Sequence, residues 1–300
     1  MTKLFIVAFV LLASGAFAQH ATDPMIFRIT SAHTSFPDTA RAKGHSYDNV
    51  LYTAAEHYND SSVMIIVPPG LKSGKQVDIV CWFHGWRNNI DSLDAQFAII
   101  KQFLASHRNA ILLLPETTKN APDSYGGKLE QPNNFKLLLK DVLAKLKNEK
   151  IIHKHTVPGN VVLAGHSGAF RVMAYILQQG GVAIKQTILF DGLYSQVDKF
   201  SNWIQQDEAH HFINLYTNKG GGTDAVSAEM MQVLRERNIL FISAEEKDVN
   251  ATLLKTNRVI FIHSLKEHNN VVNRPDENLK LFLDNVDGLA QVFPERVTNY

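Results

Sequence analysis

Short, continuously apolar runs alternate with amphipathic segments along most of this chain. The apolar runs have the length and the content of β-branched residues that strands buried on both faces require. We expect strands at Met25–Thr30, Val63–Val67, Val77–Phe83, Ala110–Leu114, Asn160–Ala164, Gln186–Phe190, Phe212–Tyr216, Ile239–Ile242 and Val259–Ile262. Apolar residues recur at helical spacing in Asp91–Ala105, Phe135–Leu146, Phe170–Gln179, Phe200–Gln206, Ala225–Arg237 and Leu279–Leu283. The alternation predicts an α/β fold, in which a mostly parallel sheet carries helices on both faces.

The amino terminus has the three parts of a secretory signal peptide. Lys3 supplies the positive charge, Leu4–Leu12 the apolar core, and Ala16-Phe17-Ala18 the small-residue cleavage site. The apolar run is too short to cross a bilayer comfortably, which disfavours a membrane anchor. We therefore expect cleavage after Ala18, no transmembrane segment in the mature chain, and a secreted or periplasmic location. The remainder, residues 19–300, is predicted to be one domain.

Charge and cysteine content exclude several classes of partner. Without Lys3, the 30 basic residues fall to the same number as the 29 acidic ones. A neutral chain without a basic cluster has no electrostatic footprint for nucleic acid. Histidine pairs such as His153 and His155 lack partners at metal-ligand spacing, so no metal or cofactor is expected. The single cysteine, Cys81, lies in an apolar strand pattern and is read as a small buried hydrophobe.

One turn carries the strongest chemical signal. The strand that ends near Ala164 passes through Gly165-His166-Ser167-Gly168-Ala169 into the next helix. A serine at a sharp strand-to-helix turn, with small residues two positions away on either side, matches the G-x-S-x-G nucleophile elbow. Ala169 stands where that pattern has its last glycine. The geometry exposes a serine hydroxyl to a general base, which this weak nucleophile requires.

Other polar residues follow neighbouring strands at the same expected edge of the sheet, where ligands bind in open α/β sheets. They are His84-Gly85-Trp86, Asp191, Asp224 and His268. The order Ser, acid, His is the order of the catalytic triad in α/β-hydrolases.

These motifs, H-G-W at 84–86, G-H-S-G-A at 165–169, F-D-G-L-Y at 190–194 and the late His268, make the chain resemble the α/β-hydrolase superfamily. The resemblance is to its secreted serine esterases, lipases and depolymerases. It implies an α/β-hydrolase fold, without a large cap domain because the stretch after Asp191 is short. It also implies roles for individual residues: Ser167 as nucleophile, His268 as general base, the backbone N–H groups of Trp86 and Gly168 as the oxyanion hole, and His84, Gly85 and His166 around the substrate pocket, with His84 bracing its loop.

Two assignments stay open between alternatives. His263 competes with His268 as the base, although it falls at the end of its strand. Asp191 is favoured as the acid because it ends a strand and is followed by Gly192, which lets the chain turn. Asp224 follows the next strand, the more common place for the acid, but Thr223-Asp224 also fits a helix N-cap.

The function predicted from these residues is hydrolysis of an ester, in preference to an amide, through an acyl-enzyme formed on Ser167. The partner would be a small-molecule or polymeric ester. A non-catalytic binding protein on the same fold is the alternative, because Ala169 departs from the motif and two residues compete for the acid.

Overall fold

The structure is a computed structural model that describes residues 23–272 and 277–292. The predicted signal peptide, residues 1–18, lies outside the described residues, so it stays a prediction. No helix of the described part is long and apolar enough to span a membrane.

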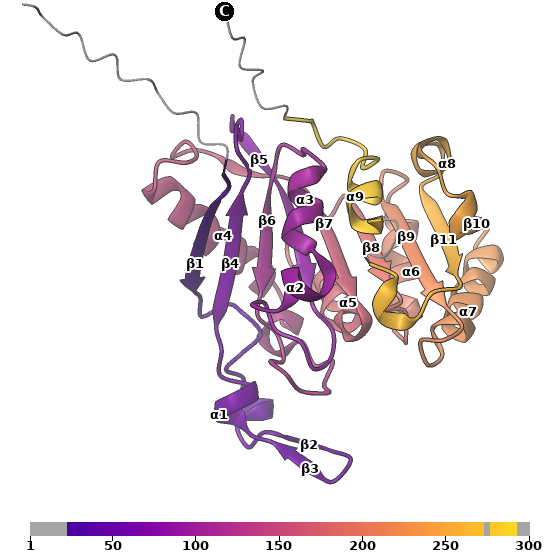
Figure 1. Cartoon of the computed structure of the whole chain (residues 1–300), viewed down its shortest axis with the longest axis horizontal. Helices are drawn as coiled ribbons and strands as arrows, with labels where there is room; N and C mark the ends of the chain where they lie inside the picture. The colour runs from indigo at the N-terminus through magenta and orange to yellow at the C-terminus, as the bar shows by residue number, and fades with distance from the viewer. Residues whose placement is uncertain (1–22, 273–276, 293–300) are drawn as a thin grey trace, which may run out of the picture.

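A single large sheet organises the described residues (Figure 1). Its nine strands have the order β1-β4-β6-β5-β7-β8-β9-β11-β10. Strand β4 pairs antiparallel with both β1 and β6, and every other pairing is parallel. The strands are β1 (Met25–Thr30), β4 (Ser62–Val67), β5 (Gln76–Phe83), β6 (Ala110–Pro115), β7 (Val157–His166), β8 (Gln186–Phe190), β9 (His211–Thr217), β10 (Ile242–Glu245) and β11 (Val259–Ser264). The mostly parallel sheet predicted from the sequence is confirmed.

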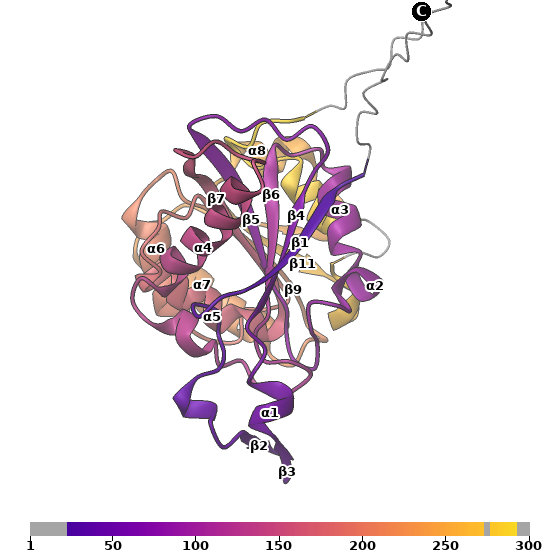
Figure 2. The same cartoon turned by 90° about the vertical axis from the view of Figure 1, so that its left-hand side faces the viewer.

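Helices cover both faces of this sheet (Figure 2). One face carries α4 (Asn134–Asn148), α5 (Phe170–Gln179), α6 (Val197–Gln206) and α7 (Thr223–Glu236). The other carries α2 (Leu93–Phe97), α3 (Ile99–Ala105), α8 (Ala251–Thr256) and α9 (Asn278–Leu283). Strand β6 shows why its sequence is continuously apolar: Leu113 packs into the core under α4 and α5, and its neighbour Leu112 into the core under α3 and α9.

The edge strand β10 departs from the prediction. The sequence placed a strand at 239–242, whereas the strand runs from Ile242 to Glu245. Leu240, which the pattern treated as a core residue, is 88% exposed. At an edge only one face of a strand is covered, so β10 alternates between half-buried and exposed residues and has no apolar run to mark it. The short helix α8 was also not predicted.

The helix expected at 91–105 is two helices. Ala98 has a left-handed backbone, with φ of 52°, and it ends α2 and begins α3. The carboxylate of Asp94 accepts hydrogen bonds from the N–H groups of Ile100 and Lys101, at 2.8 and 3.1 Å, and so caps the second helix. The apolar spacing continues through the break, which is why periodicity alone did not reveal it.

The connection from β1 to β4 forms a projection at one end of the molecule (Figures 1 and 2). It contains a two-stranded hairpin, β2 (His45–Tyr47) and β3 (Val50–Tyr52), followed by the short helix α1 (Ala54–His57). The projection runs from residue 31 to residue 61, between the two antiparallel strands at one side of the sheet.

The break at Ala98 yields a prediction about stability. A left-handed residue with a Cβ atom costs about 1–2 kcal/mol, a cost that glycine avoids. Ala98→Gly should therefore raise the free energy of unfolding by about 1 kcal/mol. The matched change Ala95→Gly, at an exposed position within α2, should lower it by about 0.5–1 kcal/mol. Urea unfolding of both variants measures this, and a loss of stability in Ala98→Gly would contradict it.

Candidate active site

Ser167 occupies the sharp turn between β7 and α5. Its φ is 56°, a left-handed conformation that is unfavourable for serine and must be held by the surroundings. A Cβ added to Gly85 would lie 2.6 Å from the Cβ of Ser167, and one added to Gly192 would lie 3.0 Å from its carbonyl oxygen. Glycine at these two positions therefore lets two neighbouring loops pack directly against the serine.

The departure from the motif at Ala169 has a structural reason. Ala169 is helical, with φ of −63°, and lies buried in the first turn that leads into α5. Its backbone has no need for glycine. The close approach falls on Gly165 instead, where an added Cβ would lie 2.7 Å from both Ala169 Cβ and Met173 Sδ.

An acid–histidine pair forms at the ends of β8 and β11. Asp191 follows β8, and His268 lies in the loop after β11, with its Nδ1 2.5 Å from Asp191 Oδ2. Asp191 has no exposed surface. Its Oδ1 accepts hydrogen bonds from the N–H of Thr217, at 3.1 Å, and from the hydroxyl of Thr223. Three groups therefore hold the carboxylate: the N–H of Thr217, the hydroxyl of Thr223 and a ring nitrogen of His268.

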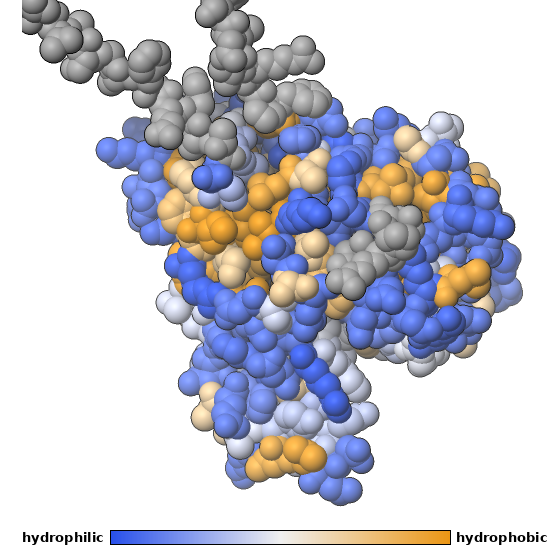
Figure 3. Space-filling view, viewed as in Figure 1, coloured by the Kyte–Doolittle hydropathy of each residue, from blue (hydrophilic) through white to orange (hydrophobic). Residues whose placement is uncertain are grey.

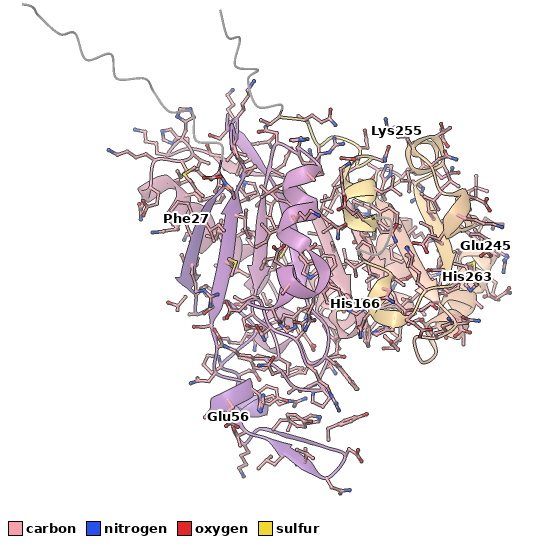
Figure 4. The ribbon with its side chains drawn as sticks, in the orientation of Figure 1. Phe27, Glu56, His166, Glu245, Lys255 and His263 are labelled. Atoms are coloured by element: carbon pink, nitrogen blue, oxygen red, sulfur yellow. The ribbon has the colours of Figure 1, made fainter. Side chains whose placement is uncertain are left out.

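The two competing candidates lie elsewhere. Asp224 is in the first turn of α7, and the N-cap of that helix is Gly222, without a side-chain hydrogen bond. The expected capping role of Thr223 and Asp224 is therefore wrong, because the Thr223 hydroxyl is directed to Asp191. His263 points toward Glu245, with Nδ1 2.9 Å from Oε2, at the outer edge of the sheet (Figure 4).

His166, directly before the serine, is buried and packs on the histidine of the pair. The ring centroids of His166 and His268 are 4.5 Å apart, and His166 Nε2 donates to the carbonyl oxygen of His268 at 3.0 Å. Burial, and then the nearby charge of His268, lower the pKa of His166 to about 3. His166 is therefore neutral at physiological pH. Only 3% of its surface is exposed, and its ring packs against the ring of His268 from the protein interior.

A buried pair of side chains, His84 and Glu116, holds the loop at 84–86 in place. His84 Nε2 lies 2.6 Å from Glu116 Oε1, and both side chains are buried. The second oxygen of Glu116 accepts from the N–H of Ile90 at 3.2 Å. His84 thus braces the loop and contributes no accessible surface, whereas Trp86 is 41% exposed.

The backbone of this loop lies against the serine turn. A Cβ added to Gly85 would lie 2.7 Å from the carbonyl oxygen of His166 and 3.2 Å from the backbone nitrogen of Gly168. One added to Gly168 would lie 2.5 Å from Cδ1 of the Trp86 side chain, so the residues expected to form the oxyanion hole are neighbours. Among the described residues, the N–H of Trp86 has no hydrogen-bond acceptor. That leaves it free to donate to a bound ligand.

Sequence reasoning missed Tyr194, although it lies within the F-D-G-L-Y motif. Its hydroxyl donates to the carbonyl oxygen of Gly220. Burial, and then the charge of Asp191, raise the pKa of Tyr194 to about 12, so it stays protonated. Its ring centroid is 6.4 Å from that of His268. Tyr194 therefore lies beside the Asp191–His268 pair.

Three further contributors were missed, for two different reasons. Glu116 directly follows β6, so the rule that selected Asp191 would also have found it. Thr217 and Thr223 carried no signal, because a threonine at a strand end or helix start is ordinary. Within 23–272 and 277–292, no group of three or more His, Cys, Asp or Glu side chains could hold a metal ion.

Comparison with known proteins was made at the levels of sequence and structure. No protein-family model matches the sequence, and no curated protein matches it. Solved structures do match. A ferulic acid esterase has a TM-score of 0.52 at 8% identity, over 88% of this chain and 99% of its own. The feruloyl esterase module from Clostridium thermocellum, complexed with sinapinate, has a TM-score of 0.52 at 10% identity, over 91% and 92%.

A third similar structure is the fluorophosphonate-binding serine hydrolase F of Staphylococcus aureus, with a TM-score of 0.50 at 8% identity, over 88% of this chain and 98% of its own. Identities this low bear on the fold alone. The similarity nevertheless spans nearly the whole of each neighbour. The chain therefore has the α/β-hydrolase fold that its motifs predicted.

Proposed function

We propose that this protein is a serine hydrolase that cleaves an ester through an acyl-enzyme intermediate. The observation that carries the proposal is the buried Asp191 paired with His268 next to a serine in a left-handed turn. The left-handed backbone of Ser167 and the buried carboxylate of Asp191 each lower the free energy of unfolding. Such costs concentrate at functional sites.

In the proposed reaction, Ser167 Oγ attacks the carbonyl carbon while His268 Nε2 takes its proton. Asp191 keeps the Nδ1 proton in place and stabilises the imidazolium that forms. The protonated His268 then gives its proton to the leaving alcohol, which departs and leaves the acyl group on Ser167. A water molecule, deprotonated by His268, hydrolyses the acyl-enzyme.

The backbone N–H groups of Trp86 and Gly168 would stabilise the oxyanion of each tetrahedral intermediate. Support comes from the contact between these two residues and from the unpaired N–H of Trp86. The Glu116–His84 pair would hold this loop in place before substrate arrives, so little reorganisation is needed during the reaction.

We favour an ester over an amide because two of the similar structures are esterases. The stretch between Asp191 and α6 is short and forms no cap over the site. The site is therefore open enough for a polymeric ester as well as a small one.

The first prediction concerns the nucleophile. Ser167→Ala should lower hydrolysis of an activated ester by about 10³-fold or more, because the triad acts as a unit, and should abolish labelling by a fluorophosphonate probe. His268→Ala should lose a comparable amount, whereas His263→Ala, at the sheet edge, should stay within about twofold of the wild type. Kinetics and mass spectrometry of the labelled protein measure this. A folded wild-type protein that resists the probe would favour a binding function instead.

The second prediction separates the two acids. Asp191→Asn keeps the shape of the side chain but favours the wrong tautomer of His268, so activity should fall by about 10³- to 10⁴-fold. Asp224→Asn should change activity by less than about twofold, and it should cost less than about 1 kcal/mol of stability through the dipole of α7. The same ester assay tests both. A larger loss for Asp224→Asn would transfer the role to that residue.

The third prediction concerns pH. The pKa of His166 falls to about 3 on folding, so the unfolded chain binds a proton between about pH 6.5 and 3 that the folded chain does not. Stability is therefore full above pH 6.5 and is lost as the pH falls. Between pH 7 and pH 5 the wild type should lose about 2 kcal/mol more than His166→Asn, which cannot titrate. Urea midpoints at both values measure the difference, and equal losses would contradict it.

A further inference from the structure

Two exposed aromatic rings lie beside the proposed nucleophile. The centroids of Trp86 and Tyr47 are 5.3 Å apart at an interplanar angle of 72°, and the two residues are 41% and 39% exposed. Trp86 also borders Gly168, which follows Ser167 directly. The pair therefore begins at the reaction centre and extends onto the β2–β3 hairpin. Large apolar side chains left in solvent at such a place indicate a binding surface.

Hydrogen bonds fix the orientation of the tryptophan ring. Trp86 Nε1 donates to Ser124 Oγ at 2.7 Å, so the polar atom of the indole is already engaged. What remains exposed is apolar ring surface. The neighbouring residue, Asp123, accepts from Arg41 Nε at 2.7 Å and so ties the base of the hairpin to the same loop. Consecutive residues of one loop thus hold both the tryptophan and the hairpin.

Further contacts make the hairpin a rigid support. The guanidinium of Arg41 lies 4.7 Å from the ring centroid of Tyr125, and the Tyr125 hydroxyl donates to Asp38 at 3.1 Å. Gly44 turns the chain into β2 with φ of 79°, and an added Cβ there would lie 2.2 Å from the carbonyl oxygen of Tyr52. The two rings are therefore held in place before a ligand arrives, which lowers the entropic cost of binding.

The register of the hairpin decides which side chains join the tryptophan. Tyr47 pairs with Val50 and Ser46 with Leu51, so Tyr47 and Val50 share the face that meets Trp86. Val50 is exposed on that face. Leu51 is also exposed but lies on the opposite face, and the apolar patch of the hairpin is visible at the lower end of Figure 3. The surface continuous with the site thus consists of Trp86, Tyr47 and Val50.

We propose that Trp86, Tyr47 and Val50 form a subsite that binds a flat aromatic ring of the substrate, so that the preferred ester carries an aryl group. This inference rests on the proposed ester hydrolysis and specifies its substrate class. Two aromatic rings at a steep angle present one face and one edge to a third ring, an arrangement that favours an aromatic guest over a flexible alkyl chain. The shared requirement is a ring within reach of Ser167, on either the acyl or the alcohol side of the ester.

The experiment compares ring-bearing and straight-chain esters of similar size. Methyl 3-phenylpropanoate against methyl hexanoate places the ring on the acyl side, and 2-phenylethyl acetate against hexyl acetate places it on the alcohol side. The readout is the ratio of kcat/KM within each pair. We expect the wild type to prefer the ring-bearing ester in one pair by roughly fivefold or more.

Three variants test the assignment. Tyr47→Ala should lower that ratio about three- to tenfold, whereas Tyr47→Phe, which retains the ring, should preserve it. Leu51→Ala removes an equally exposed side chain from the other face of the same hairpin, and it should behave as the wild type. A ratio unchanged in Tyr47→Ala, or lowered equally in Leu51→Ala, would overturn the subsite.

Binding without turnover keeps this proposal separate from the proposed function. Trp82 and Trp203 are buried, so Trp86 is the tryptophan that reports on ligands at the surface. Titration with free 3-phenylpropanoate should change its fluorescence at lower concentration than hexanoate does, and Tyr47→Ala should remove the difference. If the wild type hydrolyses no ester yet shows this preference, the hydrolase proposal fails and the subsite stands. If both carboxylates act alike, the subsite is wrong.

Discussion

A carboxylate without solvent must be compensated by the protein, and Asp191 is such a group at the centre of this molecule. An unpaired buried charge would cost several kcal/mol. Its partners come from four parts of the chain: the ring of His268 after β11, the N–H of Thr217 at the end of β9, the Thr223 hydroxyl at the start of α7, and Gly220, where a side chain would collide with the carboxylate. Satisfying this one charge therefore brings together the ends of three neighbouring strands and one helix.

The turn at Ser167 is likewise held in place by its surroundings. The strained backbone of the serine is held between Gly85 and Gly192, each of which approaches so closely that a side chain would not fit. Because Gly85 belongs to the loop that Glu116 and His84 brace, and Gly192 follows Asp191, the serine is fixed by the elements that supply its proposed partners. The proposed nucleophile, the Asp191–His268 pair and the loop at 84–86 therefore form one packed unit. A change in any of them would disturb the others, as is typical of residues that act together.

The projection between β1 and β4 adds an exposed aromatic surface to this unit. In the sheet and helices, apolar side chains are buried on two cores, whereas the hairpin leaves Tyr47 and Val50 in solvent next to Trp86. The ion pair between Arg41 and Asp123 and the aromatic contacts around it make the projection rigid, although its own apolar core is small. A fold shared with proteins of 8–10% identity says little about substrate, and the differences in a site's surroundings decide it.

The sequence alone determined the architecture, because strands buried on both faces must be apolar throughout and their helices amphipathic. It also determined the elbow at Ser167 and the edge of the sheet where the polar residues gather, since parallel strands bring their carboxyl ends together. The sequence pattern did not reveal three features. Strand β10 lies at the sheet edge and is covered on one face, so it has no continuous apolar run. The break at Ala98 and the β2–β3 hairpin depend on local backbone geometry, which leaves no apolar periodicity. Only the tertiary structure decided that Asp191 rather than Asp224 faces His268, that Tyr194 lies beside this pair, and that Tyr47 lies against Trp86. These are contacts between residues far apart along the chain, and their geometry depends on sheet order and loop paths that local sequence patterns do not encode.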